Sequence, residues 1–540
     1  MLISENIRFS VHRVDTGKTT YLANRIKKSS EVYGPANIMV ASFTRAAAAE
    51  IASRGIAIPR ENVGTLHALC YRALGGWKVA EELLPDWNTR YKKWALSTGV
   101  RSMDDPSEMA GATEGDLLMQ RLEVLRAKMI PLDLYPDNVL FFRNQWEAWK
   151  KEQGCIDFTD MIEIAHRDLE FAPGNPAIGI FDEVQDFTPL ELALIRKWAQ
   201  NMTAVVLAGD DDQCLYSFKG ADPAVFFEYN VPEENRMVLS QSYRVPRAVQ
   251  ELAERFIRRA KKRKEKVYLP RAADGEVRRL VGANFKVPEV LLADMDRYLA
   301  EGKRVMVLAS CSYMLDPLKR LLRERGYPFH NPYRKKRGDW NPLERRGGNG
   351  KSTIDRMFAY LLPSIEYTGD TSRPWTIADL KKWAELVAAK DIFIRGRKSL
   401  LEIMSEDDLP DDFLSTADLS EYLTEAGLVG AMSMDPRWLL DHAVSARRSA
   451  LEYPVRVLER YGRAAFERDP QIVLGTIHSV KGGEADVVYV YPDLSMLAMQ
   501  NYLASQAGVD AVVRQFYVAM TRARESLVLC GPATRMFVKI

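Results

Sequence analysis

The chain has 540 residues, of which 47% are apolar and 27% are charged, and its formal net charge is only +2. This length is too great for one hydrophobic core, so we expect about two to four domains. The balance of charge neither favours nor excludes a nucleic-acid partner, because a DNA track can be built from local basic patches.

The cysteine pattern and the absence of long apolar runs indicate where in the cell the protein is found. The five cysteines are scattered without a CxxC pair, which is typical of reduced thiols rather than of disulfides or zinc ligands. No apolar run approaches the roughly 20 residues that a membrane span needs. The polar N-terminus also lacks the apolar core of a signal peptide. We therefore expect a cytoplasmic protein without membrane contact.

Seven short runs rich in β-branched residues alternate with helical patterns, and turn residues follow each run. Such runs predict buried parallel strands. They lie at residues 38–41, 177–181, 204–207, 305–309, 472–476, 487–490 and 526–530. Because one group precedes residue 240 and the other follows it, the sequence predicts two α/β sheet domains.

Each group of strands is interrupted by a long segment without strand signals. The two segments have helical patterns, as in FFRNQWEAWKKEQG and TIADLKKWAELVAAK. We therefore predict two α/β cores, each with a helical insertion. The predicted boundaries are residues 1–75 with 155–240 for the first core, 76–154 for its insertion, 241–339 with 456–540 for the second core, and 340–455 for its insertion.

A strand–turn–helix pattern near the N-terminus contains Gly17, Lys18 and Thr19 at its turn. In a P-loop such a glycine lets backbone N–H groups approach phosphates, the lysine reaches the β- and γ-phosphates, and the threonine hydroxyl binds Mg²⁺. The full pattern GxxxxGK[ST] requires glycine where His12 stands, and Asp15 occupies a position that is commonly glycine. This segment alone leaves a nucleotide site and a plain strand-to-helix turn equally open.

Carboxylates follow a second apolar run, in AIGIFDEVQDFTPLE. At the end of a buried strand, Asp182 could hold Mg²⁺ while Glu183 polarises the attacking water, as phosphoryl transfer requires. A third run ends in Asp210–Asp212 and Gln213, and this glutamine could sense the γ-phosphate or orient the water. Three strand ends with these side chains favour one shared nucleotide site over three coincidences.

Seven segments resemble, in order, the motifs of superfamily 1 helicases of the UvrD/Rep group. They are VASFTRAAAAEI, VGTLHALCYRAL, FDEVQDFTPLE, LAGDDDQCLYSFKGADP, LSQSYRVPRAV, VLGTIHSVKGGEADVVYV and FYVAMTRARESLVL. The match spans nearly the whole sequence, and the two helical insertions fall where this family carries its 1B and 2B subdomains. The resemblance implies an α/β protein with two RecA-like parallel-sheet domains, 1A and 2A, and a composite ATP site between them.

The resemblance also implies roles for the nucleotide-site residues. ATP and Mg²⁺ binding would fall to Gly17, Lys18, Thr19, Thr20, Asp182, Tyr243 and Glu484, with Mg²⁺ on Thr19 and Asp182 and adenine on Tyr243. Glu183 would activate water, and Gln213 would contact the γ-phosphate. Arg244 and Arg522 would be arginine fingers from the second core, which neutralise charge on the transferred phosphoryl group. Hydrolysis would then require closure of the cleft.

A DNA track is implied by the same resemblance. Single-stranded DNA is held without sequence preference by aromatic faces and phosphate contacts. The residues implied are Phe43, Thr44, His67, Tyr216, Phe218, Lys219 and His478. Because Tyr216 and Phe218 follow Gln213 closely, one short loop could couple ATP state to base stacking. Lys219 stands where the family usually has arginine, so the charge is kept and the bidentate fork is lost.

Two basic runs are candidate contacts to the DNA backbone, with an ordinary solvated surface as the alternative. They are RRAKKRKEK at residues 258–266 and YRKKR at residues 333–337. A second partial P-loop pattern, RRGGNGKST at residues 345–353, lacks both a preceding strand and the first glycine. We interpret that segment as a linker.

The sequence thus predicts an ATP-dependent helicase or translocase that moves along single-stranded DNA and acts at junctions with duplex. The resemblance alone implies 3′-to-5′ polarity and a bacterial or phage-infected cell, with DNA repair and replication both compatible. The alternative is a catalytically weakened or silent DNA-binding protein. A carboxylate at Asp15 would repel phosphates, and its Cβ would obstruct a tight loop.

Overall fold

The structure is a computed structural model and describes residues 7–12, 17–43, 58–97, 113–223, 232, 235–334, 338–344, 352–361, 371–404 and 412–540. The chain divides into two compact units, one of Met1–Leu315 with Gly475–Ile540 and one of Asp316–Leu474. Within the described ranges, no helix combines the length and apolar character needed to cross a membrane. All five cysteines are free and buried.

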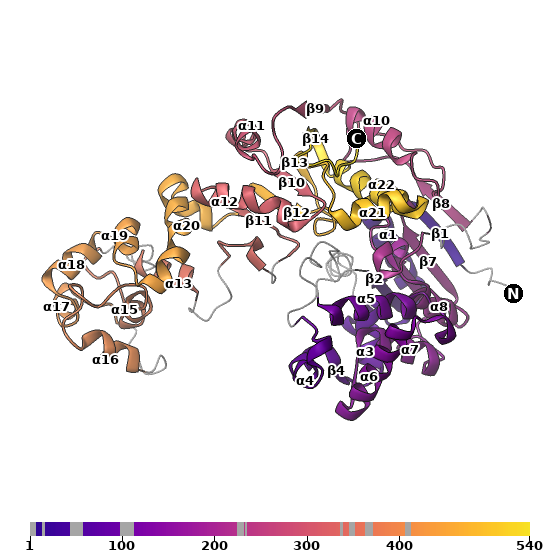
Figure 1. Cartoon of the computed structure of the whole chain (residues 1–540), viewed down its shortest axis with the longest axis horizontal. Helices are drawn as coiled ribbons and strands as arrows, with labels where there is room; N and C mark the ends of the chain where they lie inside the picture. The colour runs from indigo at the N-terminus through magenta and orange to yellow at the C-terminus, as the bar shows by residue number, and fades with distance from the viewer. Residues whose placement is uncertain are drawn as a thin grey trace. The chain divides into compact units, whose positions relative to one another are not determined.

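Six parallel strands form the first sheet of the larger unit, in the order β3-β2-β6-β7-β1-β8 (Figure 1). The strands are β1 Ile7–His12, β2 Ile38–Ser42, β3 Val63–Gly64, β6 Ile178–Asp182, β7 Ala204–Gly209 and β8 Arg236–Leu239. β2 and β6 are buried along their whole length, as expected for strands covered on both faces. β7 lies between β1 and β6, so the ends of these three strands are neighbours.

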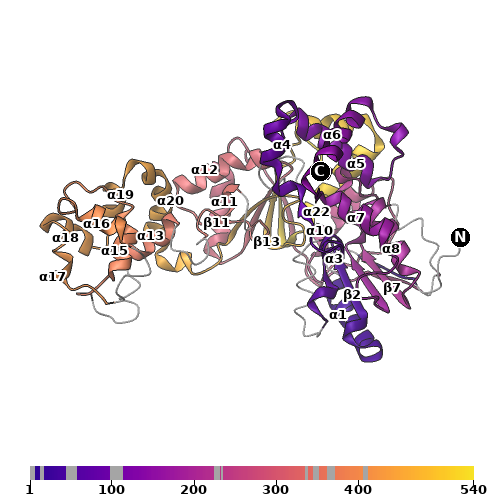
Figure 2. The ribbon, with the colours of Figure 1, turned by 90° about the horizontal axis from the view of Figure 1, so that it is seen from below.

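Helices cover both faces of this sheet (Figure 2). On one face Leu22 of α1 packs in the same core as Val40 of β2. On the other face Trp198 of α8 packs with Met39 of the same strand, together with α3 and α7. Successive side chains of β2 therefore enter opposite layers, as the pleat of a strand requires. The helices are α1 Lys18–Tyr33, α3 Leu66–Ala73, α7 Phe158–Asp168 and α8 Pro189–Ala199.

The segment between α3 and α7 is mainly helical and has its own aromatic core. It contains β4 Lys78–Val79, α4 Leu84–Arg90, α5 Glu114–Ala127, α6 Asp137–Gln153 and β5 Cys155–Ile156. Trp87, Trp146 and Trp149 pack against one another at the centre of this core. Arg126 of α5 pairs with Asp157, the N-cap of α7, and so ties the insertion to the sheet. The described part of residues 76–154 is mainly helical, as predicted, whereas the predicted domains and their boundaries stay a prediction.

Four further parallel strands of the larger unit, in the order β10-β13-β14-β9, form part of a second sheet. These strands are β9 Glu276–Leu280, β10 Val305–Ala309, β13 Ala485–Val490 and β14 Ala523–Cys530, and their helices are α10 Arg247–Ile257, α11 Glu289–Ala300, α21 Met496–Ala504 and α22 Gln506–Met520. We call the larger unit up to Leu239 the first lobe and its remainder the second lobe. The predicted fold class, α/β with two RecA-like parallel-sheet domains, is confirmed.

The smaller unit is mainly helical. Its helices are α12 Asp316–Glu324, α13 Thr353–Tyr360, α15 Ile377–Ala384, α16 Arg397–Ile403, α17 Thr416–Leu419, α18 Glu425–Met432, α19 Pro436–Asp441 and α20 Ser445–Tyr461. The short strand β11 (Phe329–His330) pairs in parallel with β12 (Ile472–Thr476), which begins in this unit. Tyr360, Trp375 and Trp383 form its buried aromatic centre.

All seven strands predicted from apolar runs are present, but four strands of the two sheets were missed. β8 is an edge strand of the first sheet and exposes most of its residues. β9 is also an edge strand and carries Glu276, Arg278 and Arg279. Edge strands are covered on fewer sides, so they tolerate charged residues, and β9 has no apolar run to detect. The apolar part of β8 is only three residues long, Met237–Leu239. β3 and β11 contain only two residues each.

Candidate nucleotide and DNA site

The carboxyl ends of β1, β6 and β7 meet at one edge of the first sheet, which is where open α/β sheets bind ligands. Lys18 begins α1 after β1, Asp182 ends β6, and Gln213 follows β7. The Lys18 ammonium lies 2.8 Å from Asp182 Oδ1 and also pairs with the Glu183 carboxylate. The lysine after β1 and the carboxylates after β6, which the sequence assigns to one nucleotide site, are therefore in direct contact.

Of the turn predicted to bind phosphate, the structure describes Gly17 onward, directly before α1. Gly17 has a φ of 75°, in the left-handed region that favours glycine. A Cβ at this position would lie 3.5 Å from Cε2 of Tyr243, whose ring is 66% exposed. Tyr243 therefore stands beside the nucleotide turn, as expected for a residue that stacks on adenine. Thr19 is half-buried and Thr20 is exposed in the first turn of α1.

Glu183 adopts a conformation that is uncommon for a residue with a side chain. Its φ is 58°, in the left-handed region, and such outliers often mark functional sites. Its carboxylate accepts a hydrogen bond from Gln185 Nε2 at 2.5 Å and lies 3.1 Å from Lys481 Nζ of the second lobe. Gln185 Oε1 accepts the backbone N–H of Asp210 at 3.0 Å, which links the ends of β6 and β7.

Asp186 joins the first lobe to the second. Its side chain is buried, pairs with the Lys481 ammonium and accepts the Leu215 backbone N–H at 3.2 Å. Burial raises the pKa of Asp186, although the charge of Lys481 opposes that shift. Sequence reasoning did not single out Gln185 and Asp186, although both follow Glu183 closely in FDEVQDFTPLE, one of the segments that resemble helicase motifs.

Arg522 of the second lobe contacts the first lobe at Gln213. Its Nη2 donates to Gln213 Oε1 at 3.2 Å, and the side chain is fixed by donation to the Val518 and Gly483 carbonyls at 2.9 and 3.2 Å. Arg522 is 1% exposed. A guanidinium held at this point faces the end of β7, as an arginine finger from the opposite lobe must.

The second predicted arginine finger, Arg244, is paired within its own lobe. Its Nε donates to Glu484 Oε2 at 2.7 Å, and Arg524 donates to the other oxygen of that carboxylate at 2.6 Å. Burial alone would raise the pKa of Glu484, but the two guanidinium groups outweigh it and hold the pKa below its ordinary value. These ion pairs lie within the second lobe, and the roles assigned to Arg244 and Glu484 at the nucleotide stay predictions.

The oxygen atoms at the end of β6 suit a magnesium ion. Asp182 Oδ1 is buried and forms an ion pair with the Lys18 ammonium, 2.8 Å away. Ser42, the register partner of Asp182 on β2, has a buried Oγ without a hydrogen bond in the described part of the chain. Mg²⁺ prefers oxygen ligands, and the Thr19 hydroxyl at the start of α1 would add one. These residues fit the ion that the sequence predicts.

Four of the predicted DNA-binding side chains form an aromatic cluster with a lysine. The rings of Phe43 and Tyr216 lie 4.6 Å apart, and Phe218 lies 6.0 Å from Tyr216 and 5.6 Å from His478. The Lys219 ammonium lies 5.0 Å from the Tyr216 ring centre. Tyr216 is only 4% exposed, so it forms the centre of the cluster. Phe43 and Phe218 are the rings left partly open.

His67 has different neighbours. Its Nδ1 lies 3.6 Å from Glu191 Oε1, and its ring packs edge-on against Phe158. Burial lowers the pKa of His67, with Glu191 opposing the shift. Among the described residues, no ring contact joins His67 to the aromatic cluster. His67 therefore lies beside the track that the sequence predicts, and its role stays a prediction.

Several predicted features fall partly or wholly outside the described residues. Asp15, Thr44, residues 335–337 of the second basic run and residues 345–351 of the partial P-loop pattern lie outside them. Of His12, only the backbone is described. The first basic run is described, and it corrects an expectation. Arg263 and Lys266 have side chains only 8% and 1% exposed and pair with carboxylates, so they are not available to a DNA backbone.

Comparison with protein families covers both lobes. A family profile described as an AAA domain matches residues 15–219, and one described as the UvrD-like helicase C-terminal domain matches residues 457–531. The two matches include the turn at Lys18, the carboxylates of β6 and the arginine at 522, in the order that the motifs predict. The chain belongs to the UvrD/Rep-like superfamily 1 helicases.

UvrD/Rep-like relatives in bacteria align with most of the chain. YjcD of Bacillus subtilis, which bears the name "Putative ATP-dependent DNA helicase", is 24% identical over 583 positions, which cover 96% of this chain and 76% of YjcD. The DNA helicase UvrD2 of Mycobacterium tuberculosis is 22% identical over 584 positions, with the same shares. The DNA helicase PcrA of Staphylococcus aureus is 22% identical over 355 positions, which cover 59% of this chain and 47% of PcrA. A solved structure of the PRRSV helicase covers 98% of this chain and 54% of its own, with 10% identity and a TM-score of 0.32, too low to bear on the fold.

Proposed function

We propose that this chain is an ATP-dependent DNA helicase that moves along single-stranded DNA from 3′ to 5′ and separates strands at junctions with duplex. The observation that carries this proposal is the contact between Arg522 and Gln213, 3.2 Å apart, because it joins the second lobe to the nucleotide edge of the first. A site built from two lobes can convert ATP hydrolysis into lobe movement. The names of the relatives support ATP-dependent action on DNA.

The chemistry assigns separate tasks to the residues at the strand ends. Lys18 now neutralises Asp182 and Glu183, and the phosphates of ATP would compete for its ammonium. Asp182 and Thr19 would hold Mg²⁺, which neutralises phosphate charge when it is bound. Glu183, released from Lys18, would orient and deprotonate water, while Arg522 would neutralise charge that develops on the phosphoryl group.

The loop after Gln213 supports the coupling of this reaction to DNA. Gln213 contacts Arg522, and three residues later the chain enters the aromatic cluster of Tyr216, Phe218 and Lys219. Partly open Phe43 and Phe218 would stack on bases, and the lysine would neutralise a phosphate. A movement of Gln213 on hydrolysis would therefore shift the surface on which the bases rest.

The first test is steady-state ATP hydrolysis with and without single-stranded DNA. Strong stimulation by DNA is expected for the wild type, with a loss of at least ~100-fold in Glu183→Gln, because the water-activating carboxylate is gone. Glu170→Gln, which removes an exposed carboxylate of the same lobe, is the control and should keep the activity. No hydrolysis by a folded wild-type chain that binds DNA would favour the silent DNA-binding alternative raised by Asp15.

A second measurement separates the effect of Asp15 from the rest of the site. If the wild type is silent, Asp15→Gly should restore hydrolysis when the loop alone is responsible, since glycine removes both the repelling charge and the Cβ. If the wild type is active, Asp15→Gly should change mainly the KM for ATP. Continued silence of Asp15→Gly would overturn the motor assignment.

Polarity is tested with two partial duplexes that differ only in the end that carries the single-stranded tail. Unwinding of the duplex with a 3′ tail, and not of the one with a 5′ tail, is expected. The reverse preference would overturn the proposed direction and leave the ATPase assignment intact.

A further inference from the structure

Three consecutive carboxylates directly after β7 are buried. The side chains of Asp210, Asp211 and Asp212 are 3%, 0% and 0% exposed. Buried carboxylates are costly unless cations and hydrogen-bond donors compensate them. The cations that compensate these carboxylates come from the second lobe.

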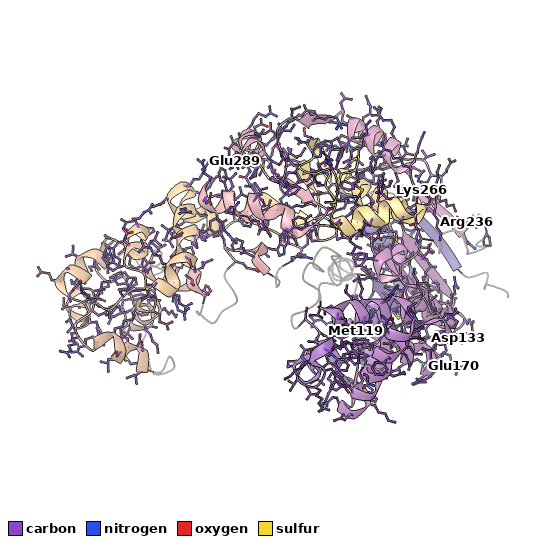
Figure 3. All side chains as sticks on the ribbon, in the orientation of Figure 1. Met119, Asp133, Glu170, Arg236, Lys266 and Glu289 are labelled. Carbon is purple, nitrogen blue, oxygen red and sulfur yellow. The ribbon has the colours of Figure 1, made fainter. Side chains whose placement is uncertain are left out.

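The segment after α10 supplies two of these cations. Arg263 donates from Nε and Nη2 to the two oxygens of Asp212 at 2.9 and 2.8 Å, a bidentate pair. The Lys266 ammonium, labelled in Figure 3, pairs with both Asp210 and Asp211. Burial lowers the pKa of Lys266, but the surrounding carboxylates outweigh this and raise it, so the lysine stays charged. From the sequence, this basic run was only a candidate contact to the DNA backbone or a solvated surface.

The same segment is also fixed to α22. The backbone N–H groups of Lys261 and Lys262 donate to the Asp510 carboxylate at 2.9 and 2.8 Å. Arg514 Nε donates to the Asp211 carbonyl at 2.9 Å, and its Nη2 donates to the Lys262 carbonyl. The acidic turn of the first lobe is therefore locked to the second lobe through side chains and backbone together.

One hydrogen-bonded chain leads from this lock to the nucleotide site. Lys266 pairs with Asp210 Oδ1, and Asp210 Oδ2 accepts from Gln213 Nε2 at 2.8 Å. Gln213 Oε1 in turn accepts from Arg522 Nη2 at 3.2 Å. An amide has one donor end and one acceptor end, so Asp210 and Arg522 together fix which way the Gln213 amide faces. We call this chain, Lys266–Asp210–Gln213–Arg522, the amide relay.

We propose that Lys266 is a positioning residue for ATP hydrolysis, acting through Asp210 to hold the Gln213 amide toward Arg522. This inference rests on the proposed function and extends it to a residue that is far in sequence from Lys18 and the other residues assigned to the phosphates. Arg263 and Arg514 hold the turn that carries Asp210, so they support the relay from outside it. Loss of Lys266 leaves Asp210 buried without its cation, and the orientation of the amide is then no longer enforced.

The relay predicts a loss of catalytic rate with little loss of nucleotide binding. In Lys266→Met, kcat of DNA-stimulated hydrolysis should fall about 10-fold or more, while KM for ATP and the affinity for a non-hydrolysable ATP analogue change by less than ~2-fold. Lys266→Gln keeps one donor for Asp210 and should lose less. Lys303→Met is the control, because Lys303 also pairs with two carboxylates, at 3.0 Å each, but on the surface of the second lobe.

A double-mutant cycle distinguishes the relay from a general loss of stability. Gln213→Ala removes the amide, so adding Lys266→Met to it should lower kcat by less than ~2-fold further. Losses that multiply in full, or a change in KM alone, would overturn the relay. Because Lys266→Met can fail to fold, Asp210→Asn in the same cycle, with thermal unfolding of each variant, provides the same comparison.

The wild type separates the two levels of inference. If the wild type is active and kcat is unaltered in both Lys266→Met and Asp210→Asn, the relay alone is overturned. Inactive wild type would overturn the proposed function and the relay with it.

Discussion

The side-chain carboxyl group of Glu81 lies in surroundings that disfavour its ionised form. Its Oε2 is buried without a hydrogen-bond partner among the described residues, while the Phe158 backbone N–H reaches the other oxygen at 3.2 Å. Burial, assisted by the nearby charge of Asp157, raises the pKa of Glu81 to about 8. Between its ordinary pKa and this value the folded chain keeps a proton that the unfolded chain has released. The stability contributed by Glu81 is therefore lost as the pH rises through this window.

Glu81→Gln should remove that dependence. The variant should gain Tm over wild type as the pH rises from about 5 to about 8, by roughly 2 °C or more at the upper end, and the gain should be constant above it. The neighbouring Glu82→Gln, an exposed position, should show no such trend. Unfolding curves at several pH values measure both, and a gain that shrinks toward high pH would contradict the raised pKa.

Two neighbouring rings of the DNA cluster should respond differently to truncation. Phe218 is partly open, so Phe218→Ala should weaken binding to single-stranded DNA about 10-fold with little change in Tm, since one base loses its stacking partner. Tyr216 is 4% exposed, so Tyr216→Ala should also lower Tm, as cavity formation in a core does. Phe171→Ala removes an exposed ring that lies outside the cluster and should do neither. Equal DNA affinity for Phe218→Ala and wild type would contradict the assigned track.

At the scale of elements, the loop that carries Tyr216 and Phe218 packs against α5, a helix of the insertion. The loop ends at Gly220, which has a φ of 97°, and a Cβ there would lie 3.3 Å from Cβ of Ala127 and 3.4 Å from Cγ of Lys128. Both of these residues are at the C-terminal end of α5. The insertion thus supports the surface on which the bases are expected to stack.

Gly220→Ala should therefore disturb both stability and DNA binding. We expect about 1 kcal/mol or more of destabilisation from the positive φ together with the tight contact, and a several-fold weaker affinity for single-stranded DNA. Gly302→Ala is matched to it, because Gly302 has a φ of 76° with nothing within 4 Å of its Cβ. Gly302→Ala therefore introduces the backbone strain without the tight contact, and it should leave the affinity for single-stranded DNA unchanged. Equal DNA affinities for the two variants would show that the α5 contact does not shape the loop.

At the scale of the whole molecule, nucleotide binding should stabilise the larger unit. A non-hydrolysable ATP analogue with Mg²⁺ should raise Tm, because ligand at 100 times its Kd adds about 2.7 kcal/mol to the stability of the state that binds it. Lys18→Met should abolish most of this shift. EDTA should reduce it, since Asp182 and Thr19 would lose the ion that they share with the phosphates. A full shift in Lys18→Met would place the nucleotide elsewhere.

The sequence by itself determined the two sheets and most of the nucleotide edge. Central strands such as β2 and β6 are buried on both faces, so they are continuous apolar runs that any reader of the sequence can find. Side chains that follow such strands must gather at one edge of a parallel sheet, which is why Lys18, Asp182 and Gln213 were predicted together. The edge strand β9 was missed because its partial exposure permits charged residues.

Only the tertiary structure decided which charged groups face one another. The run at residues 258–266 looks like a DNA contact because sequence shows a charge without its partner, whereas in the fold Lys266 and Arg263 meet buried carboxylates more than 50 positions away. Tyr216 and Phe218 are likewise both candidate stacking rings in the sequence, and the fold buries Tyr216 among neighbours such as Phe43 and Lys219. Periodicity records whether a side chain is covered, but pairing depends on chain segments that meet only after folding.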